Sequence, residues 1–185
     1  MRSTRSLALA GVLVTAALVS LGPRPAYGGS GAELARESRA ALNSLYARQS
    51  SAKLLGQKAK GILVFPSMMK AGFMFGGQVG EGTLFKNGKV AGYYNSVAAS
   101  YGFQAGVQKF GYALFFITNA ALDQLDATRG FEVGVGPSIV VVDEGMGRSM
   151  TSNTITSDAY AFIISQKGLM AGMGIQGSKI TRINK

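Results

Sequence analysis

Glycines recur four residues apart in this chain, each time within a short apolar phrase. In residues 101–108, apolar side chains occupy every second position, and glycine or glutamine occupies the positions between them. This period of two is typical of a β-strand with one apolar face and one nearly bare face. It argues against the packed membrane helices that the same glycine spacing indicates in a continuous apolar segment. The phrases are Gly72-Phe73-Met74-Phe75-Gly76, Gly102-Phe103-Gln104-Ala105-Gly106, Gly130-Phe131-Glu132-Val133-Gly134 and Gly168-Leu169-Met170-Ala171-Gly172.

Repeated glycines in strand interiors need a physical cause, because each costs about 0.5–1 kcal/mol relative to alanine. Sharp coiling of the sheet and close approach of a second layer are two structural causes. A shallow groove lined by backbone would be a third, and only that one would make a binding site. The sequence leaves the three open.

The N-terminal segment has the pattern of a secretory signal peptide. Arg2 and Arg5 precede an apolar run over residues 7–21, and the small-x-small sequence Ala26-Tyr27-Gly28 follows it. A retained membrane anchor is the alternative, although the apolar run is short for a span. We therefore expect residues 1–28 to be removed on export from a bacterial cytoplasm, and the mature protein to reside in the periplasm or cell envelope, peripheral to a membrane.

The mature chain would be basic. Residues 1–28 contain three of the 19 basic residues and none of the nine acidic ones, so their removal lowers the net charge from +10 to +7. Such a charge attracts anions. Nucleic acid is not expected as the partner of an exported protein, which leaves anionic lipid head groups or acidic envelope polymers. A purely solubilising role for the charge stays open.

Two helices are predicted at the start of the mature chain. Ser30 lies three residues before Glu33, as in a capping box, and apolar residues then recur at helical intervals over residues 31–48. A second helical piece is expected over residues 51–60, with Gly61 ending it. Its lysines could stabilise the helix dipole instead of binding a ligand.

The rest of the chain is rich in strand patterns. Pro66 is expected to end a first strand at residues 62–65, and Asn87-Gly88 between apolar flanks predicts a hairpin turn. Residues 90–117 are interpreted as two or three strands, Thr118 and Asn119 as caps of one short helix, and residues 143–145 as a turn. Further strands are expected near residues 130–136, 138–142, 160–165, 169–175 and 178–183.

The resulting fold class is α+β. We expect an antiparallel, glycine-rich, strongly coiled sheet or partial barrel, with the N-terminal helices packed on it and one short internal helix. The chain is divided into a signal peptide (1–28), an N-terminal helical segment (29–60) and a glycine-rich β core (61–185), of which the last two form one domain.

Much catalytic chemistry is excluded by composition. The chain contains no His and no Cys, so that Ser-His and Cys-His catalysis, imidazole or thiolate zinc sites, disulfides and lipidation on cysteine are all absent. The acidic pairs Asp123/Asp126 and Asp143/Glu144 have the spacing of solvated surface groups, and no phosphate-loop motif occurs. We expect a binding protein that is not an enzyme and that needs no metal or cofactor.

Several ordered motifs resemble the SYLF domain family over about residues 50–184. They are Ala59-Lys60-Gly61-Ile62-Leu63-Val64-Phe65-Pro66, Lys70-Ala71-Gly72-Phe73, the second glycine phrase followed by Val107-Gln108, Ser165-Gln166-Lys167 before the fourth phrase, Gln176-Gly177-Ser178 and Ile180-Thr181-Arg182. The resemblance implies a lipid-binding domain, since eukaryotic relatives bind phosphoinositides and, in yeast actin-patch proteins, actin filaments. Residues 138–145 depart from the eukaryotic pattern, which has a Gly-Arg-containing segment there. Actin is therefore not an expected partner.

The function expected from the sequence is non-enzymatic docking on anionic phospholipid through a basic surface. A structural or interaction module that binds an envelope protein is the alternative. The candidate lipid-binding residues are Lys53, Lys58, Lys60 and Lys70, followed by Arg36, Arg39, Lys86 and Lys89.

Overall fold

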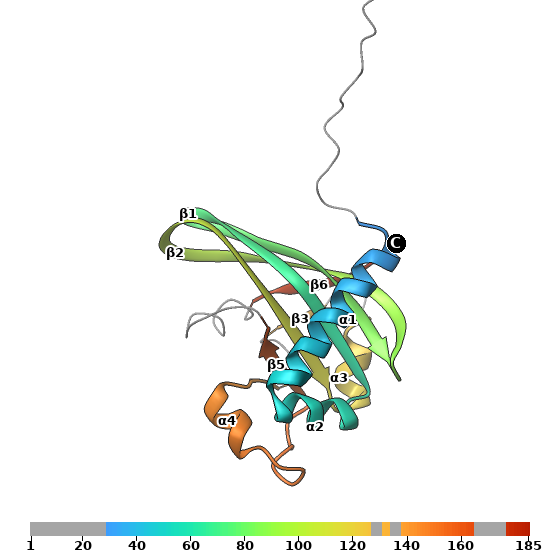
Figure 1. The fold of residues 1–185 in the computed structure, drawn as a ribbon. Helices are drawn as coiled ribbons and strands as arrows, with labels where there is room; N and C mark the ends of the chain where they lie inside the picture. The colour runs from blue at the N-terminus through green and yellow to red at the C-terminus, as the bar shows by residue number, and fades with distance from the viewer. Residues whose placement is uncertain (1–28, 127–130, 134–137, 165–176) are drawn as a thin grey trace, which may run out of the picture.

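The computed structural model describes residues 29–126, 131–133, 138–164 and 177–185 (Figure 1). The expected signal peptide, the fourth glycine phrase and the strand expected near residues 169–175 lie outside these residues. The elements are α1 (Gly31–Arg48), α2 (Ser50–Lys58), β1 (Gly61–Lys86), β2 (Lys89–Phe116), α3 (Asn119–Gln124), β3 (Phe131–Glu132), β4 (Ile139–Val141), α4 (Glu144–Ser149), β5 (Ala159–Ile163) and β6 (Lys179–Ile183).

Both N-terminal helices form close to where the sequence predicts them. The Ser30 Oγ accepts a hydrogen bond from the Glu33 N–H at 3.2 Å, which satisfies one of the N–H groups that the first turn of α1 leaves unpaired. Helix α2 ends at Lys58, two residues earlier than expected. Lys60 instead joins the sheet, because its N–H donates to the Phe116 carbonyl at 2.7 Å.

The Asn-Gly hairpin is confirmed, and it joins two very long strands. Asn87 and Gly88 have φ values of 50° and 72°, as a type I′ turn requires. The two or three strands expected over residues 90–117 are in fact one 28-residue strand, β2. The sequence predicts that Pro66 ends a strand at residues 62–65, and this prediction is wrong, because β1 continues through Pro66 to Lys86. Pro66 lies at a register shift between Phe65 and Met68, in a strand whose partner among the described strands is β2, and a missing N–H is tolerated at such an irregularity.

The β1–β2 hairpin is folded back on itself (Figure 1). One half comprises residues 61–72 of β1 and 106–116 of β2, with β5 and then β4 added beside β2. The other half comprises residues 74–86 and 89–102, with β6 and then β3 added. Among the described strands, pairing is antiparallel except in the parallel pair β4–β5. The bend lies where Gly72 pairs with Gly106, within the first two glycine phrases.

Two apolar cores result from this folding. The first lies between the two halves of the sheet, with α3 beside it, and contains Phe65 and Tyr112 stacked at 4.7 Å between ring centroids. The second lies on the opposite face of the first half. Leu42 and Leu45 of α1 and Leu55 of α2 cover that face. The helices therefore form an outer layer over a doubled sheet.

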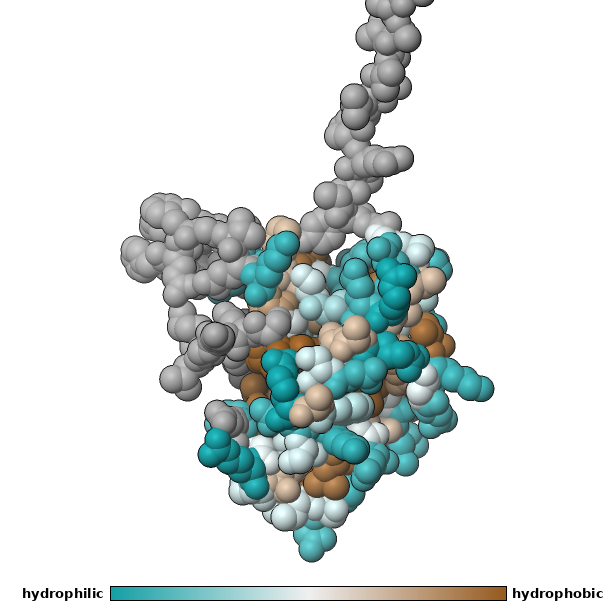
Figure 2. Space-filling model, viewed as in Figure 1, coloured by the Kyte–Doolittle hydropathy of each residue, from teal (hydrophilic) through white to brown (hydrophobic). Residues whose placement is uncertain are grey.

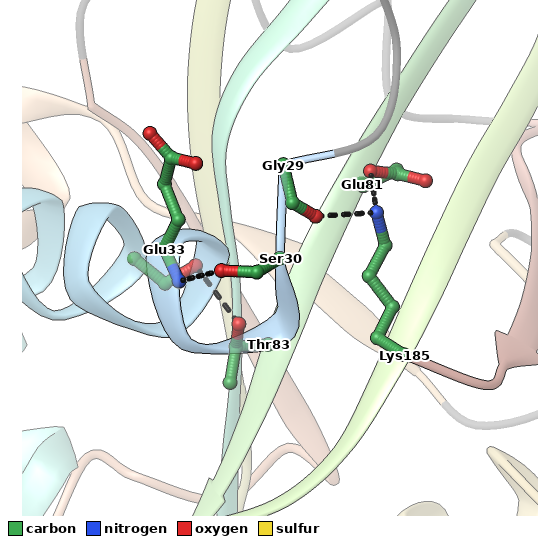
Figure 3. A network of polar contacts seen from close by, with 7 residues as sticks. Gly29, Ser30, Glu33, Glu81, Thr83 and Lys185 are labelled. Atoms are coloured by element: carbon green, nitrogen blue, oxygen red, sulfur yellow. Dashed lines mark hydrogen bonds and ion pairs between the residues drawn. The ribbon is translucent and has the colours of Figure 1, made fainter.

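Two polar contacts fasten α1 to the sheet. The Ser38 Oγ is fully buried and lies 3.3 Å from the Val64 carbonyl and 3.2 Å from the Thr83 Oγ1, one in each half of β1. Figure 3 shows the second contact, in which the Lys185 ammonium lies 2.7 Å from the Glu81 carboxylate and 3.2 Å from the Gly29 carbonyl. The start of α1 is thereby joined to the last residue of the chain and to the sheet.

The fold class expected from the sequence is confirmed. The protein is α+β, with a strongly curved sheet, N-terminal helices packed on it and the expected short internal helix, α3, capped by Thr118. Helix α4 is an additional element. It occupies the segment expected as a turn, because the Asp143 carboxylate accepts from the Met146 N–H at 2.7 Å and so caps a helix there.

Candidate functional site

Arg39 connects α1 to the tip of the hairpin. Its guanidinium donates to the Gly88 carbonyl at 2.9 Å, and its central carbon lies 4.7 Å from the centre of the Phe85 ring. A hydrogen bond together with a cation–π contact fixes the position of the side chain. The exposed turn between β1 and β2 is therefore held beside the middle of α1, and a positive charge is held beside the turn.

Lys86 and Lys89 flank the same turn and are direct register partners. Like charges directly opposite each other on paired strands repel, so this pair costs stability unless an anion or solvent screens it. Within the described part of the chain, neither ammonium has a hydrogen bond or an ion pair. Three positive charges thus converge on one turn, counting Arg39.

The C-terminal end of α2 adds two more charges at this end of the molecule. Gly61, the first residue of β1, packs against Leu84, close to the last residues of the same strand. Lys60 therefore lies at the same end as Lys86. The basic end, as this group is called below, consists of Arg39, Lys58, Lys60, Lys86 and Lys89.

Three other sequence-predicted residues lie outside the basic end. Arg36 is paired with Glu33 one turn earlier on α1 at 3.7 Å, and both side chains are exposed. Lys53 is exposed in the first half of α2. Lys70 lies ten residues along β1 from Lys60, a separation of roughly 30 Å in an extended strand. The structure therefore brings five of the eight residues together and leaves Lys70 far from them.

The surface over the N-terminal helices is mainly hydrophilic. Figure 2 shows hydrophilic residues predominating over α1 and α2, with hydrophobic ones visible between them. Among the described residues, no helix combines the length and apolarity that crossing a bilayer requires.

A small cleft that sequence reasoning missed lies between α4, the loop after it and the β4–β5 pair. Its volume is about 260 Å³. Met146 lies within α4, and Met150 follows four residues later at the end of the helix. This helical spacing after a capping Asp143 is the sequence signal for the helix, and two glycines inside the segment obscure it. The lining residues are Val140, Met146, Ser149, Met150, Thr154, Thr156, Ser157 and Tyr160.

Tyr160 anchors the loop that forms one wall of this cleft. Its hydroxyl accepts hydrogen bonds from the Thr156 and Ser157 N–H groups at 3.0 and 3.1 Å. Burial alone raises the pKa of Tyr160, but these donors stabilise the phenolate more, so the pKa lies below its usual value. The side chain carries its polar atom toward the loop and leaves the ring to the apolar wall.

The described residues include no group of three or more His, Cys, Asp or Glu side chains that could hold a metal ion. The candidate site consists of the charged surface of the basic end and the small cleft beside α4, whose lining combines an apolar wall with Ser and Thr side chains. What such a surface can do is attract an anionic partner and hold a short apolar group.

Comparison with known proteins gives one family. Residues 97–185 match the family described as Ysc84, Las17-binding protein actin regulator. The match begins within β2 and continues through the cleft and the C-terminal strand, so it excludes α1, α2 and β1. No curated protein matches the chain.

Proposed function

Because residues 97–185 belong to the Ysc84 family, the SYLF domain family that the sequence motifs resemble, we propose that this chain is a lipid-binding protein without catalytic activity. It docks on anionic phospholipid head groups at a membrane of the bacterial cell envelope. Residues 1–28 direct export and are cleaved in the process. Docking is peripheral and reversible.

The convergence of Arg39, Lys60, Lys86 and Lys89 at one end of the molecule carries this proposal. Each Lys or Arg close to an anionic membrane surface contributes about 1 kcal/mol. The three lysines together therefore provide about 3 kcal/mol, enough for reversible attachment. Screening reduces the reach of exposed charges to about 8 Å at physiological ionic strength, so docking weakens as salt is added.

Flotation with phosphatidylglycerol or cardiolipin vesicles tests the proposal. The triple variant Lys60→Gln/Lys86→Gln/Lys89→Gln is expected to partition about 100-fold less strongly than the wild type, which corresponds to about 3 kcal/mol. The matched control removes three lysines elsewhere, Lys70→Gln/Lys109→Gln/Lys179→Gln. Equal losses in the two triple variants would show that net charge, and not the basic end, drives docking.

An interaction module for an envelope protein is the second candidate. Val79 and Val97 are direct register partners on the outer face of the sheet, and they are 37% and 48% exposed. An exposed apolar pair of this kind suits a protein contact. The description of the family also names a protein, Las17, as what its members bind. Wild-type protein that fails to float with either vesicle would favour this candidate; actin binding is not proposed.

A further inference from the structure

The cleft beside α4 exposes an apolar side chain where the surrounding surface is polar. Met146 is 40% exposed at its mouth, while Val140, Met150 and Tyr160 form its apolar wall. Methionine side chains are flexible and polarisable, and they adapt to apolar groups of varied shape. The remaining lining residues are Ser149, Thr154, Thr156 and Ser157, so the cleft has one apolar and one polar side. An exposed methionine beside the apolar wall indicates a surface that receives another apolar group on that side.

Contacts on both sides of the cleft join it to the basic end. The Lys58 ammonium donates to the Ser152 carbonyl at 2.8 Å, which ties the loop after α4 to the end of α2. On the other side, Gly147 of α4 packs against Ser51 of α2, where an added Cβ would lie 3.0 Å from the Ser51 Oγ. Figure 1 shows α4 and α2 next to each other, at the end of the molecule away from the bend of the hairpin.

The occupant should therefore combine a negative charge with a narrow apolar chain. Lys58 provides positive charge at the loop that forms one side of the cleft. The volume of about 260 Å³ is just below the range of about 300–1,000 Å³ that is usual for sites enclosing a whole ligand. It fits part of a ligand, such as the end of one hydrocarbon chain.

We propose that this cleft receives one acyl chain of an anionic phospholipid when the protein docks on a bilayer. The inference rests on the proposed function and adds a second, apolar contact to it. The phosphate group stays at the surface near Lys58, and the chain end lies against Met146, Met150 and Tyr160. Attachment then depends on both charge and apolar burial.

The absence of tryptophan from the chain allows a direct experiment. Met146→Trp places the only indole at the mouth of the cleft, and Thr181→Trp places it on exposed strand β6, in the other half of the sheet. Phosphatidylglycerol vesicles with bromine on their acyl chains quench an indole that contacts those chains. We expect most of the Met146→Trp emission to be lost and the rest to shift to the blue, and the Thr181→Trp emission to change little.

Ser149→Trp, on the exposed end of α4, repeats the experiment if Met146→Trp does not fold, and it should be quenched in the same way. Met146→Asp should weaken partitioning about tenfold, because burial of a methionine side chain is replaced by exposure of a charge. Binding of Met146→Asp at wild-type strength would overturn the proposal.

Flotation of the same samples distinguishes failure of the acyl-chain proposal from failure of the docking proposal. Protein that floats without quenching at either cleft position would overturn the acyl-chain proposal and leave head-group docking intact. Protein that does not float would overturn the docking itself. A blue shift of Met146→Trp with a polyglutamate peptide, but not with vesicles, would assign the cleft to an acidic protein partner and overturn the proposal as well.

Discussion

At the scale of single residues, Gly82 lies where the two halves of β1 approach each other closely. A Cβ added there would lie 2.7 Å from both the Val64 carbonyl and the Phe65 ring. Backbone cannot move aside as a flexible side chain can, so the bare face of the strand is needed for this contact. Among the causes considered from the sequence, close approach therefore explains this glycine.

Gly82→Ala should lower the free energy of unfolding by about 1–3 kcal/mol, because the new methyl group overpacks a backbone contact. Gly77→Ala is the matched control. Its Cβ would have its nearest neighbour, the Ala98 carbonyl, at 3.8 Å, so this change should stay within about 0.5 kcal/mol of the wild type. Urea unfolding measures both, and equal stability of the two variants would contradict the close-packing explanation.

Tyr112 is fully buried in the core between the two halves of the sheet, and its hydroxyl donates to the Ser96 Oγ at 2.9 Å. Burial raises the pKa of Tyr112 well above its usual value, and the Ser96 bond offsets part of that rise. Because the pKa of Tyr112 is higher in the folded than in the unfolded protein, the unfolded protein loses this proton first as the pH rises. The neutral phenol therefore contributes its full stabilisation below the unfolded pKa of 10.0, and this contribution is lost as the pH rises above that value.

Above about pH 10, each such tyrosine should lower the free energy of unfolding by up to about 1.4 kcal/mol per pH unit. Tyr112→Phe should make this alkaline decline shallower, at a cost of about 1 kcal/mol at neutral pH from the lost hydrogen bond. Tyr160→Phe should do the reverse and make the decline steeper, since the Tyr160 pKa is lowered in the folded protein. Urea unfolding between about pH 8 and 11.5 measures both slopes. Parallel slopes in the two variants would exclude this account.

At the scale of elements, the hairpin turn sets the register of the longest strand pair. Gly88 has a φ of 72° and open space around its Cα, so backbone conformation alone demands glycine there. The same turn holds Lys86 opposite Lys89 and receives Arg39. A change in the turn should therefore affect both stability and the basic end.

Gly88→Val should destabilise the protein by about 2 kcal/mol, because a β-branched residue at positive φ is strained. Asn87→Gly is the control, since glycine adopts the φ of 50° at that position without strain. Thermal melts give the stability, and vesicle flotation gives the effect on docking. If Gly88→Val melted at the wild-type temperature, the turn would not determine the pairing.

At the scale of the whole molecule, the positive net charge serves docking only where the protein has access to anionic lipid, and the expected export would provide that access. The basic end can meet lipids on the periplasmic side of the envelope only if the protein leaves the cytoplasm. Mass spectrometry of protein recovered from the periplasm should give a chain that begins near Gly29. A recovered chain that still carries residues 7–21 would contradict cleavage and would favour the retained anchor. The uncleaved variant Ala26→Arg/Gly28→Arg provides a reference mass.

The features that could be predicted from the sequence are those that depend on interactions between residues close together in the chain. The Ser30 cap, the Asn87-Gly88 turn and the bounds of α1 depend on residues within four positions of one another, so the pattern alone specifies them. The fold class followed from the period of two and the capped helices. Strand ends were predicted less well, because Pro66 is tolerated at the register shift in β1, and the glycines of β1 and β2 lie within continuous strands that bend without ending.

Tertiary structure alone decided which charges converge and where the cleft lies. Arg39 reaches the Gly88 carbonyl 49 residues away, and Lys58 reaches the Ser152 carbonyl 94 residues away. Neither contact has a sequence period that could reveal it, because each joins segments that are far apart in the chain and meet only in the folded protein. The sequence by itself determined the total positive charge and the local elements. The packing of β1 against itself determined that five of the basic residues share one end of the molecule.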